Sequence, residues 1–101
     1  MITVLASISV KAGKLSDFLE IFKANVPHVR KENGCAEYFP AVDIDAELPG
    51  QSFDENVVTV VERWESPEAL RAQAGAPHML TYREKVKDMV EGVSVKILRE
   101  A

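Results

Sequence analysis

The sequence is poor in the residues that build disulfides and metal sites. It has a single cysteine, Cys35, and only two histidines among 101 residues. One thiol cannot form an internal disulfide, and one thiol with two imidazoles does not supply the four ligands of a structural zinc site. We therefore expect no resident metal. The predicted compartment is the cytoplasm, where a chain without a disulfide framework belongs.

Glycine and proline are also scarce, with five of each, and neither a glycine-rich phosphate loop nor a serine elbow is present. Phosphoryl transfer and acyl transfer therefore lose their usual sequence support. A hydrophobic content of 47% is typical of an ordinary packed globule. The length allows one domain, residues 1–101, and leaves no room for a separate nucleotide-binding half.

Positive charge is in deficit: 12 Lys and Arg stand against 16 Asp and Glu, for a net charge of −4. No basic run marks a nucleic-acid footprint, so we exclude nucleic acid as a partner. Nor does any apolar run reach the roughly 20 residues that a membrane span needs. The apolar start, residues 1–10, ends at Lys11 and lacks the cationic segment of a signal peptide. We expect no membrane partner.

The first half of the chain predicts a strand followed by a helix. Apolar and polar residues alternate over 2–10, the period of a strand. Apolar residues then recur every three or four positions, which predicts an amphipathic helix from Leu15 to Val29 with Ser16 as its N-cap. Pro27 removes a backbone donor, so we expect a kink or a second short helix over about residues 27–32.

Two segments rich in β-branched or aromatic residues, 35–42 and 57–64, predict the next two strands. Pro40 indicates an edge strand or a bulge in the first of them. The polar, acidic segment 43–56 between them is about twice the usual loop length, which favours a functional or mobile loop.

The last third predicts two helical segments and a strand. Ser66 is the expected N-cap of a helix that has Pro67 at its first position and ends at Gly75. Pro77 opens a second helix that we expect to run to Gly92. The final strand contains Val93, Val95 and Ile97.

The element order β-α-β-β-α-β predicts a ferredoxin-like α+β fold, with an antiparallel sheet that carries its helices on one face. The third strand is nevertheless apolar on both faces, with Val57 and Val61 on one and Val58, Val60 and Trp64 on the other. A half-solvated sheet tolerates that poorly. We therefore expect a second copy to cover the open face in a symmetric homodimer.

The segments VVERWESPEAL at residues 60–70, APHM at 76–79 and RKENGC at 30–35 together resemble the antibiotic biosynthesis monooxygenase family. The strand order and length fit as well, so the resemblance covers nearly the whole chain. It implies a dimeric α/β barrel of two ferredoxin-like subunits, each with an apolar pocket between sheet and helices. It also implies oxidation of phenolic or quinol compounds by molecular oxygen without metal, flavin or haem.

The chain departs from the family pattern at two places. That pattern has a histidine where Gln73 stands, followed by a second histidine that His78 matches. The haem-degrading branch needs an asparagine on the first strand, where Ser7 stands, and a tryptophan near residue 73. The resemblance therefore disfavours haem.

Oxidation without a cofactor needs a base, an apolar chamber and a donor for the developing oxyanion. His78 is the candidate base, because imidazole titrates near neutrality and a helix start favours its neutral form. Trp64 could stack on a flat aromatic ligand and direct its N–H at an oxygen. Tyr82 lies one helical turn after His78 and could act as donor or acid. Each of the three also has a purely structural interpretation, at a helix start or in a core.

Four further residues are candidates for substrate binding. Arg30 and Glu62 either form a structural pair or orient a substrate. Met79 either lines a pocket or belongs to a core stripe. Gln73 occupies the position of the family's histidine. Cys35 has no cationic sequence neighbour that would activate it, which favours a buried, inert thiol.

These patterns predict a homodimeric, cofactor-free monooxygenase that acts on a small aromatic phenol or quinol. Two alternatives stay open on the same fold. One is an isomerase or lyase of small carbonyl compounds, in which His78 abstracts a proton. The other is a ligand-binding dimer without catalysis. Oxygen uptake would separate the monooxygenase from both alternatives.

Overall fold

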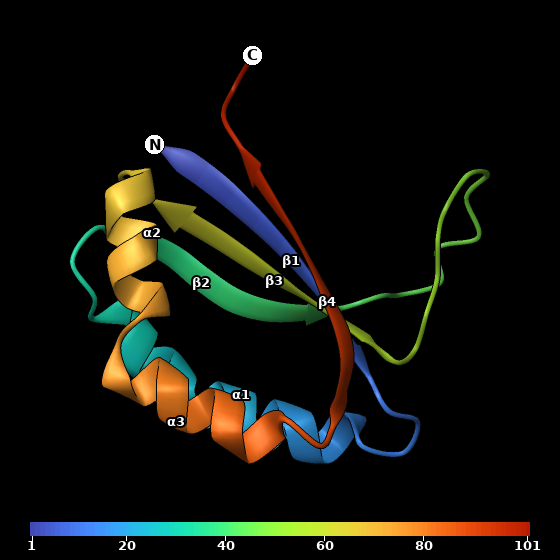
Figure 1. Cartoon of the computed structure of the whole chain (residues 1–101). Coiled ribbons are helices and arrows are strands. Elements are labelled where there is room, and N and C mark those ends of the chain that lie inside the picture. Colours follow the sequence, from blue (N-terminus) through green and yellow to red (C-terminus); the bar gives the residue numbers. More distant parts are fainter.

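A computed structural model describes all residues from 1 to 101. The four strands form one antiparallel sheet in the order β2-β3-β1-β4, and all helices lie on one side of it (Figure 1). This is the predicted ferredoxin-like α+β fold. The elements are β1 (Ile2–Val10), α1 (Leu15–Arg30), β2 (Cys35–Val42), β3 (Val57–Trp64), α2 (Pro67–Ala74), α3 (Pro77–Val86) and β4 (Val90–Leu98).

The core lies between the sheet and the helices. Alternation in β1 and β3 turns every second side chain toward the helices, as the period of two requires. The buried residues of these two strands are Val4, Ala6, Ile8, Val10, Val58, Val60, Glu62 and Trp64. The longest helix, α1, covers them with Phe18, Phe22, Val26 and Val29.

Helix α1 differs from the prediction at both ends. It begins at Leu15 with Lys14 at the cap position and no side-chain cap, so the predicted capping by Ser16 is wrong. Pro27 lies inside one continuous helix that ends at Arg30, and no second helix forms over 27–32. Pro27 is exposed while its neighbour Val26 is buried. Packing of the apolar face therefore outweighs the hydrogen bond that proline removes.

The chain around the last helix also differs from the prediction. Helix α3 ends at Val86 instead of Gly92, and β4 begins at Val90, three residues before the first predicted strand position. The apolar spacing after Val86 fits a helix as well as an extended segment. Pairing of Val90 with Val10 of β1 decides between them, at the cost of a register shift beside Gly92.

Several local predictions are confirmed. Ser66 caps α2, its Oγ accepting a hydrogen bond from the Ala69 backbone N–H at 3.2 Å. Strand β2, which contains Pro40, is an edge strand with an irregularity near its start. Gly34 precedes it with a φ of +85°, and a Cβ there would lie 2.7 Å from the Cβ of Ala69. Only glycine meets both requirements of this turn.

The 43–56 segment is a long loop that stands away from the body of the molecule (Figure 1). Hydrogen bonds within the loop give it a defined shape, such as the one from the Asp54 N–H to Asp43 Oδ2 at 3.0 Å. It exposes three large apolar side chains, Ile44, Leu48 and Phe53. None of the three helices of the molecule combines the length and the apolarity that crossing a membrane demands.

Candidate functional site

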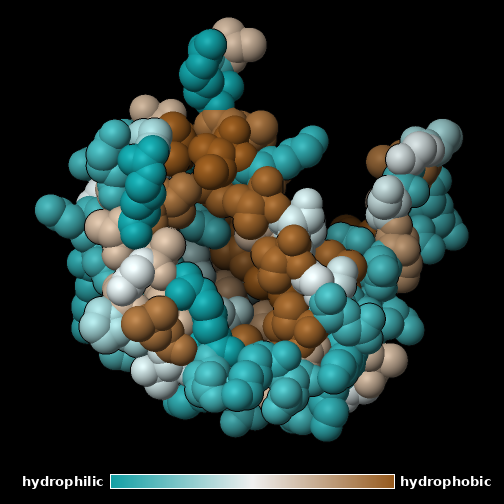
Figure 2. Space-filling view, viewed as in Figure 1, coloured by the Kyte–Doolittle hydropathy of each residue, from teal (hydrophilic) through white to brown (hydrophobic).

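An apolar hollow opens between the inner face of the sheet and the helices (Figure 2). It consists of two adjoining cavities of about 360 Å³ and about 340 Å³, which share the lining residues Ile8, Tyr82, Arg83 and Val93. We call the two cavities together the chamber. Their volumes lie within the range of small-molecule sites, roughly 300–1,000 Å³.

Strands β1 and β4 form an apolar wall of the chamber. The register pairs Ile8 with Val93 and Ala6 with Val95, so these side chains point to the same face of the sheet. No helix covers β4, which leaves Val93 and Val95 61% and 54% exposed. The chamber is therefore open along β4, where the brown surface of Figure 2 is visible.

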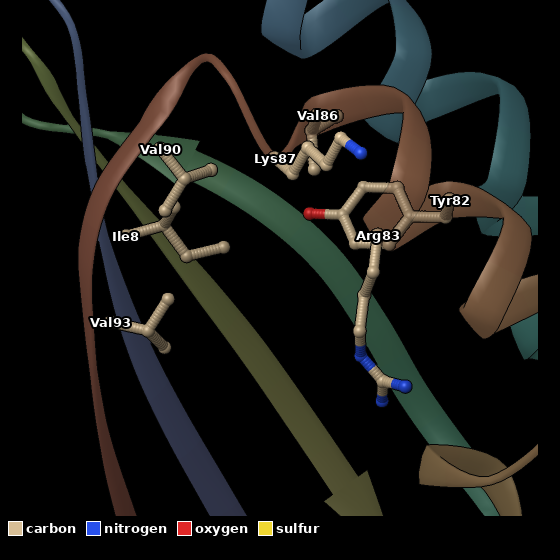
Figure 3. Close-up of a pocket in the computed structure, with 7 residues that line it drawn as sticks. All are labelled: Ile8, Tyr82, Arg83, Val86, Lys87, Val90 and Val93. Atoms are coloured by element: carbon tan, nitrogen blue, oxygen red, sulfur yellow. The ribbon is translucent and has the colours of Figure 1, made fainter.

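A cluster of aromatic rings between α1, α3 and β2 positions two phenol groups at the chamber. Phe22 stacks on Tyr38 and meets Tyr82 edge-on, each at 5.6 Å between ring centroids. The Tyr82 hydroxyl points toward Ile8 and Val90 on the strand side of the cavity (Figure 3). Burial raises the pKa of both tyrosines far above the ordinary value. Both hydroxyls are therefore protonated donors at neutral pH.

Glu62 places a carboxyl group on the chamber wall, in the middle of the sheet. It lies opposite Val4 of β1 and Tyr38 of β2 and is only 7% exposed. The indole Nε1–H of Trp64 donates to Glu62 Oε1 at 2.9 Å, and no cation pairs with the carboxyl. Burial raises the pKa of Glu62, and the Trp64 hydrogen bond opposes this only in part.

Gln73 of α2 is the second polar residue enclosed at the chamber. It is 4% exposed, and its side-chain amide makes no hydrogen bond within the protein. Every side-chain nitrogen or oxygen that is fully covered has a hydrogen-bond partner. Because the Gln73 amide atoms have none, they are not fully covered and face the open space of the chamber. Buried polar groups are nearly always paired, and unpaired ones that face a cavity mark a place for a ligand.

The chamber brings together four of the residues singled out in the sequence. Glu62, Gln73, Met79 and Tyr82 all line the larger cavity. They come from β3, α2 and α3, so the predicted fold is what makes them neighbours.

His78 lies outside the chamber, in the interface between α1 and α3. Its Nε2 is 2.6 Å from Glu32 Oε1 and its Nδ1 is 3.4 Å from Asn25 Nδ2. Its ring stacks on that of His28, with 5.8 Å between the ring centroids. His78 borders a separate cavity on this outer side, which Tyr82 also reaches.

Trp64 and Arg30 do not line the chamber either. Trp64 is wholly buried, so no part of its indole is open to a stacked ligand. The Nε–H of Arg30 donates to the Tyr38 carbonyl at 3.0 Å, beside a separate cavity along β2. Arg30 forms no ion pair with Glu62, so the structural pair considered from the sequence is absent.

The larger cavity also contains two residues with polar side-chain groups, Tyr38 and Arg83, that were not among the predicted site residues. Tyr38 faces the chamber because it pairs with Glu62 across β2 and β3. Arg83 lines both cavities, with its Nη2 donating to the Ala74 carbonyl at 2.6 Å. In the sequence, only the alternation of β2 and the position of Arg83 next to Tyr82 indicate that these two residues could belong to a site. Neither identifies a site without the register of the strands.

The chamber contains hydroxyl, carboxyl, amide and guanidinium groups in an apolar enclosure, and no group of three or more metal-ligating side chains occurs in the molecule. The sequence profile of the family described as "Antibiotic biosynthesis monooxygenase" matches residues 1–85. The chain belongs to this family.

A curated relative supports this membership, and solved structures share the fold. The chain is 38% identical over 101 residues to the probable quinol monooxygenase YgiN of Escherichia coli K12, covering 98% of this chain and 97% of YgiN. The fold matches that of Rv0793 from Mycobacterium tuberculosis with a TM-score of 0.81 at 25% identity, over 99% and 94% of the two chains. A Nitrosomonas europaea protein whose name places it in the same family has the same fold, with a TM-score of 0.85 at 22% identity over 99% and 98%.

Proposed function

We propose that this member of the family is a cytoplasmic monooxygenase that oxidises a small aromatic phenol or quinol with molecular oxygen, without a cofactor. The observation that carries the proposal is the chamber, an apolar and aromatic enclosure with a few polar groups facing into it. The name of the relative YgiN supports a quinol as one substrate class.

The chemistry of oxygen explains why such a chamber suffices. Triplet oxygen reacts slowly with closed-shell phenols, whereas a phenolate donates an electron to it readily. In the overall reaction one oxygen atom becomes a new quinone oxygen. The other leaves as water with the hydroxyl hydrogen and a ring hydrogen. The aromatic compound loses four electrons and oxygen gains four, so no outside reductant is needed. The protein must supply a proton acceptor, donors for the oxyanion and shelter from water.

The groups around the chamber suit these tasks. Tyr38 and Tyr82 present protonated hydroxyls, and the Arg83 guanidinium lies on the same wall as Tyr82. We assign Tyr82 and Gln73 to binding of substrate oxygens and Met79 to the apolar wall. His78 lies outside, and we propose that it joins α3 to α1 through Glu32 instead of acting on substrate.

We also propose that two copies associate through the outer face of the sheet. Phe39, Val61 and Leu5 lie side by side across β2, β3 and β1 on the face without helices. Phe39 is 39% exposed in the single chain. Covering this apolar row with the same row of a second copy would give a self-complementary interface.

Oxygen consumption by metal-stripped protein with a panel of naphthols, hydroquinones and catechols tests the proposed activity. Ala74→Trp fills the mouth of the chamber, because Ala74 lines the larger cavity. Ala72→Trp is the matched control, an exposed position on the same helix away from the cavity. We expect uptake above autoxidation that Ala72→Trp keeps and Ala74→Trp loses. Absence of uptake with every compound, or uptake that Ala74→Trp does not affect, would contradict the proposal.

A further inference from the structure

We infer that Glu62 is a catalytic residue that accepts the hydroxyl proton of the aromatic substrate. The inference rests on the proposed oxidation and deepens it, because it assigns the proton acceptor of the reaction. The sequence alone indicates His78 for this role and makes Glu62 only a candidate for substrate binding.

The first observation is the geometry of the carboxyl group. Oε1 of Glu62 is occupied by the indole N–H of Trp64, whereas Oε2 receives no hydrogen bond from the protein. Since no fully covered polar atom lacks a partner, Oε2 is open to the chamber. A residue that is 93% buried thus keeps one carboxylate oxygen available to a ligand in the chamber. A hydroxyl donor is the complement of such an oxygen.

The second observation is the charge around Glu62. Cys35 and Tyr38 face it from β2, and Arg83 of α3 is the cation that shares the larger cavity with it, beside Tyr82. Lys87 lines only the smaller cavity and pairs with Glu84. The neighbours from β1 and α2, Val4 and Gln73, carry no charge. Arg83 directs Nη2 at the Ala74 carbonyl and forms no ion pair with Glu62.

An unpaired buried carboxylate gains by taking up a proton. That is the property a base needs toward a weakly acidic hydroxyl.

Trp64 explains how the carboxyl group is held in place. It lies two residues along the same strand and therefore on the same face, and its N–H fixes Oε1 at 2.9 Å. Its side chain is wholly buried, so it acts on the substrate only through Glu62. Trp64 is thus a positioning residue. Phenylalanine there would leave the carboxyl group in the chamber without its fixed orientation.

The proton-transfer step balances without any further reactant. The O–H bond of the substrate breaks, its proton forms a new O–H bond to Oε2, and the electron pair stays on the substrate oxygen as phenolate. The phenolate then supplies the electrons that oxygen takes up. The neutral Glu62 returns its proton to the oxygen atom that leaves as water, which restores the carboxylate.

Glu62→Gln tests the inference with little change of shape, because the amide oxygen still accepts from Trp64. Glu37→Gln is the matched control, an exposed carboxylate on the neighbouring strand. General-base catalysis contributes about a hundredfold or more. We therefore expect Glu62→Gln to lower kcat by about that factor and Glu37→Gln to leave it unchanged. Thermal unfolding and circular dichroism establish that both variants fold.

The pH profile separates a base from a structural residue. The carboxylate is the active form, so turnover of the wild-type protein should fall as the pH drops through the raised pKa of Glu62. Glu62→Gln should lack this acidic limb. Glu62→Asp, which withdraws the carboxylate from the chamber, should turn over more slowly but keep the limb. It serves as the second variant should the glutamine variant fail to fold. Loss of the limb in a folded aspartate variant would contradict the assignment.

Anaerobic calorimetry with a naphthol provides a readout that does not depend on turnover. A phenol hydroxyl can donate to Oε2 of the Glu62 carboxylate. Once Glu62 is protonated, Oε2 carries the proton and Oε1 already accepts from Trp64. The affinity of the wild-type protein for the naphthol should therefore weaken on acidification, whereas that of Glu62→Gln should not. If wild-type protein turns over and Glu62→Gln keeps both kcat and the acidic limb, the assignment of Glu62 is wrong and the proposed function stands. If no compound is oxidised, the proposed function fails. Calorimetry then still tests whether Glu62 contacts the hydroxyl of a bound naphthol. The same pH dependence of affinity in the wild-type protein and in Glu62→Gln would refute that contact.

Discussion

Single residues in this protein serve either the fold or the chamber, and Glu62 shows the conflict between the two. The position lies in the middle of the sheet, opposite Val4, where an apolar side chain would pack without penalty. A carboxylate there is destabilising in its charged form, because it is buried and no cation neutralises it. Stability is commonly lost at positions that chemistry requires.

Glu62→Gln should therefore stabilise the fold at neutral pH. The folded-state pKa of Glu62 is raised, so the folded protein binds this proton more tightly than the unfolded chain does. Wild-type stability consequently declines as the pH rises from the unfolded pKa through the folded one. Glu62→Gln lacks this decline. We expect a gain on the order of 1 kcal/mol at pH 7 that disappears in acid. Urea unfolding at a series of pH values measures it, and a glutamine variant less stable at pH 7 would contradict the account.

At the scale of elements, local sequence patterns predicted nearly all of the fold. Alternation predicted the strand 2–10, β-branched and aromatic residues predicted the strands 35–42 and 57–64, and Ser66 followed by Pro67 predicted the cap of α2. The boundary of the last helix was predicted wrongly because the same apolar pattern fits two kinds of secondary structure. The residues after Val86 suit either a helix or a strand, and pairing with β1 decides between the two.

Some residues of the candidate site could likewise be predicted from the sequence, and others could not. Glu62, Gln73, Met79 and Tyr82 reach the chamber because each lies on the inward face of an element that the sequence places correctly. The orientation of His78 could not be predicted, since it depends on Asn25 of α1 and Glu32 of the following turn, more than forty residues away. Tyr38 was missed because only the register of β2 with β3 sets it beside Glu62.

The link between α1 and α3 leads to a prediction for His78→Ala. His78 and Glu32 side chains are 22% and 28% exposed, and their contact at 2.6 Å ties the start of α3 to the turn after α1. A hydrogen bond to a charged group contributes about 1.5–3 kcal/mol. We expect a lower Tm in thermal unfolding, and a smaller effect on turnover than that of Glu62→Gln. A folded His78→Ala variant that loses all activity would return the role of base to His78.

At the scale of the whole molecule, the sheet has one face covered by helices and one face open (Figure 1). The open face presents the apolar row of Phe39, Val61 and Leu5. Antiparallel sheets with one wet face usually carry polar side chains there. An apolar row in that place favours a second copy.

Val61→Glu should therefore dissociate the proposed dimer. We expect sedimentation equilibrium to give about twice 11.2 kDa for the wild-type protein and 11.2 kDa for Val61→Glu, because association would bury a carboxylate of each copy in the apolar interface. Leu80→Glu is the control, since Leu80 is 57% exposed on α3, away from the sheet. A wild-type monomer at micromolar concentration, with its fold intact, would contradict the interface.

The central claim is that the chamber transfers one atom of molecular oxygen to an aromatic ring. Incubation of metal-stripped protein with a naphthol under isotopically heavy oxygen gas, followed by mass spectrometry of the quinone, tests it most directly. The account predicts one heavy oxygen atom in the product and the other in water, with formation of the product dependent on Glu62. A quinone whose new oxygen comes from water would contradict the claim, whereas a quinone formed equally by Glu62→Gln would contradict only the assignment of Glu62.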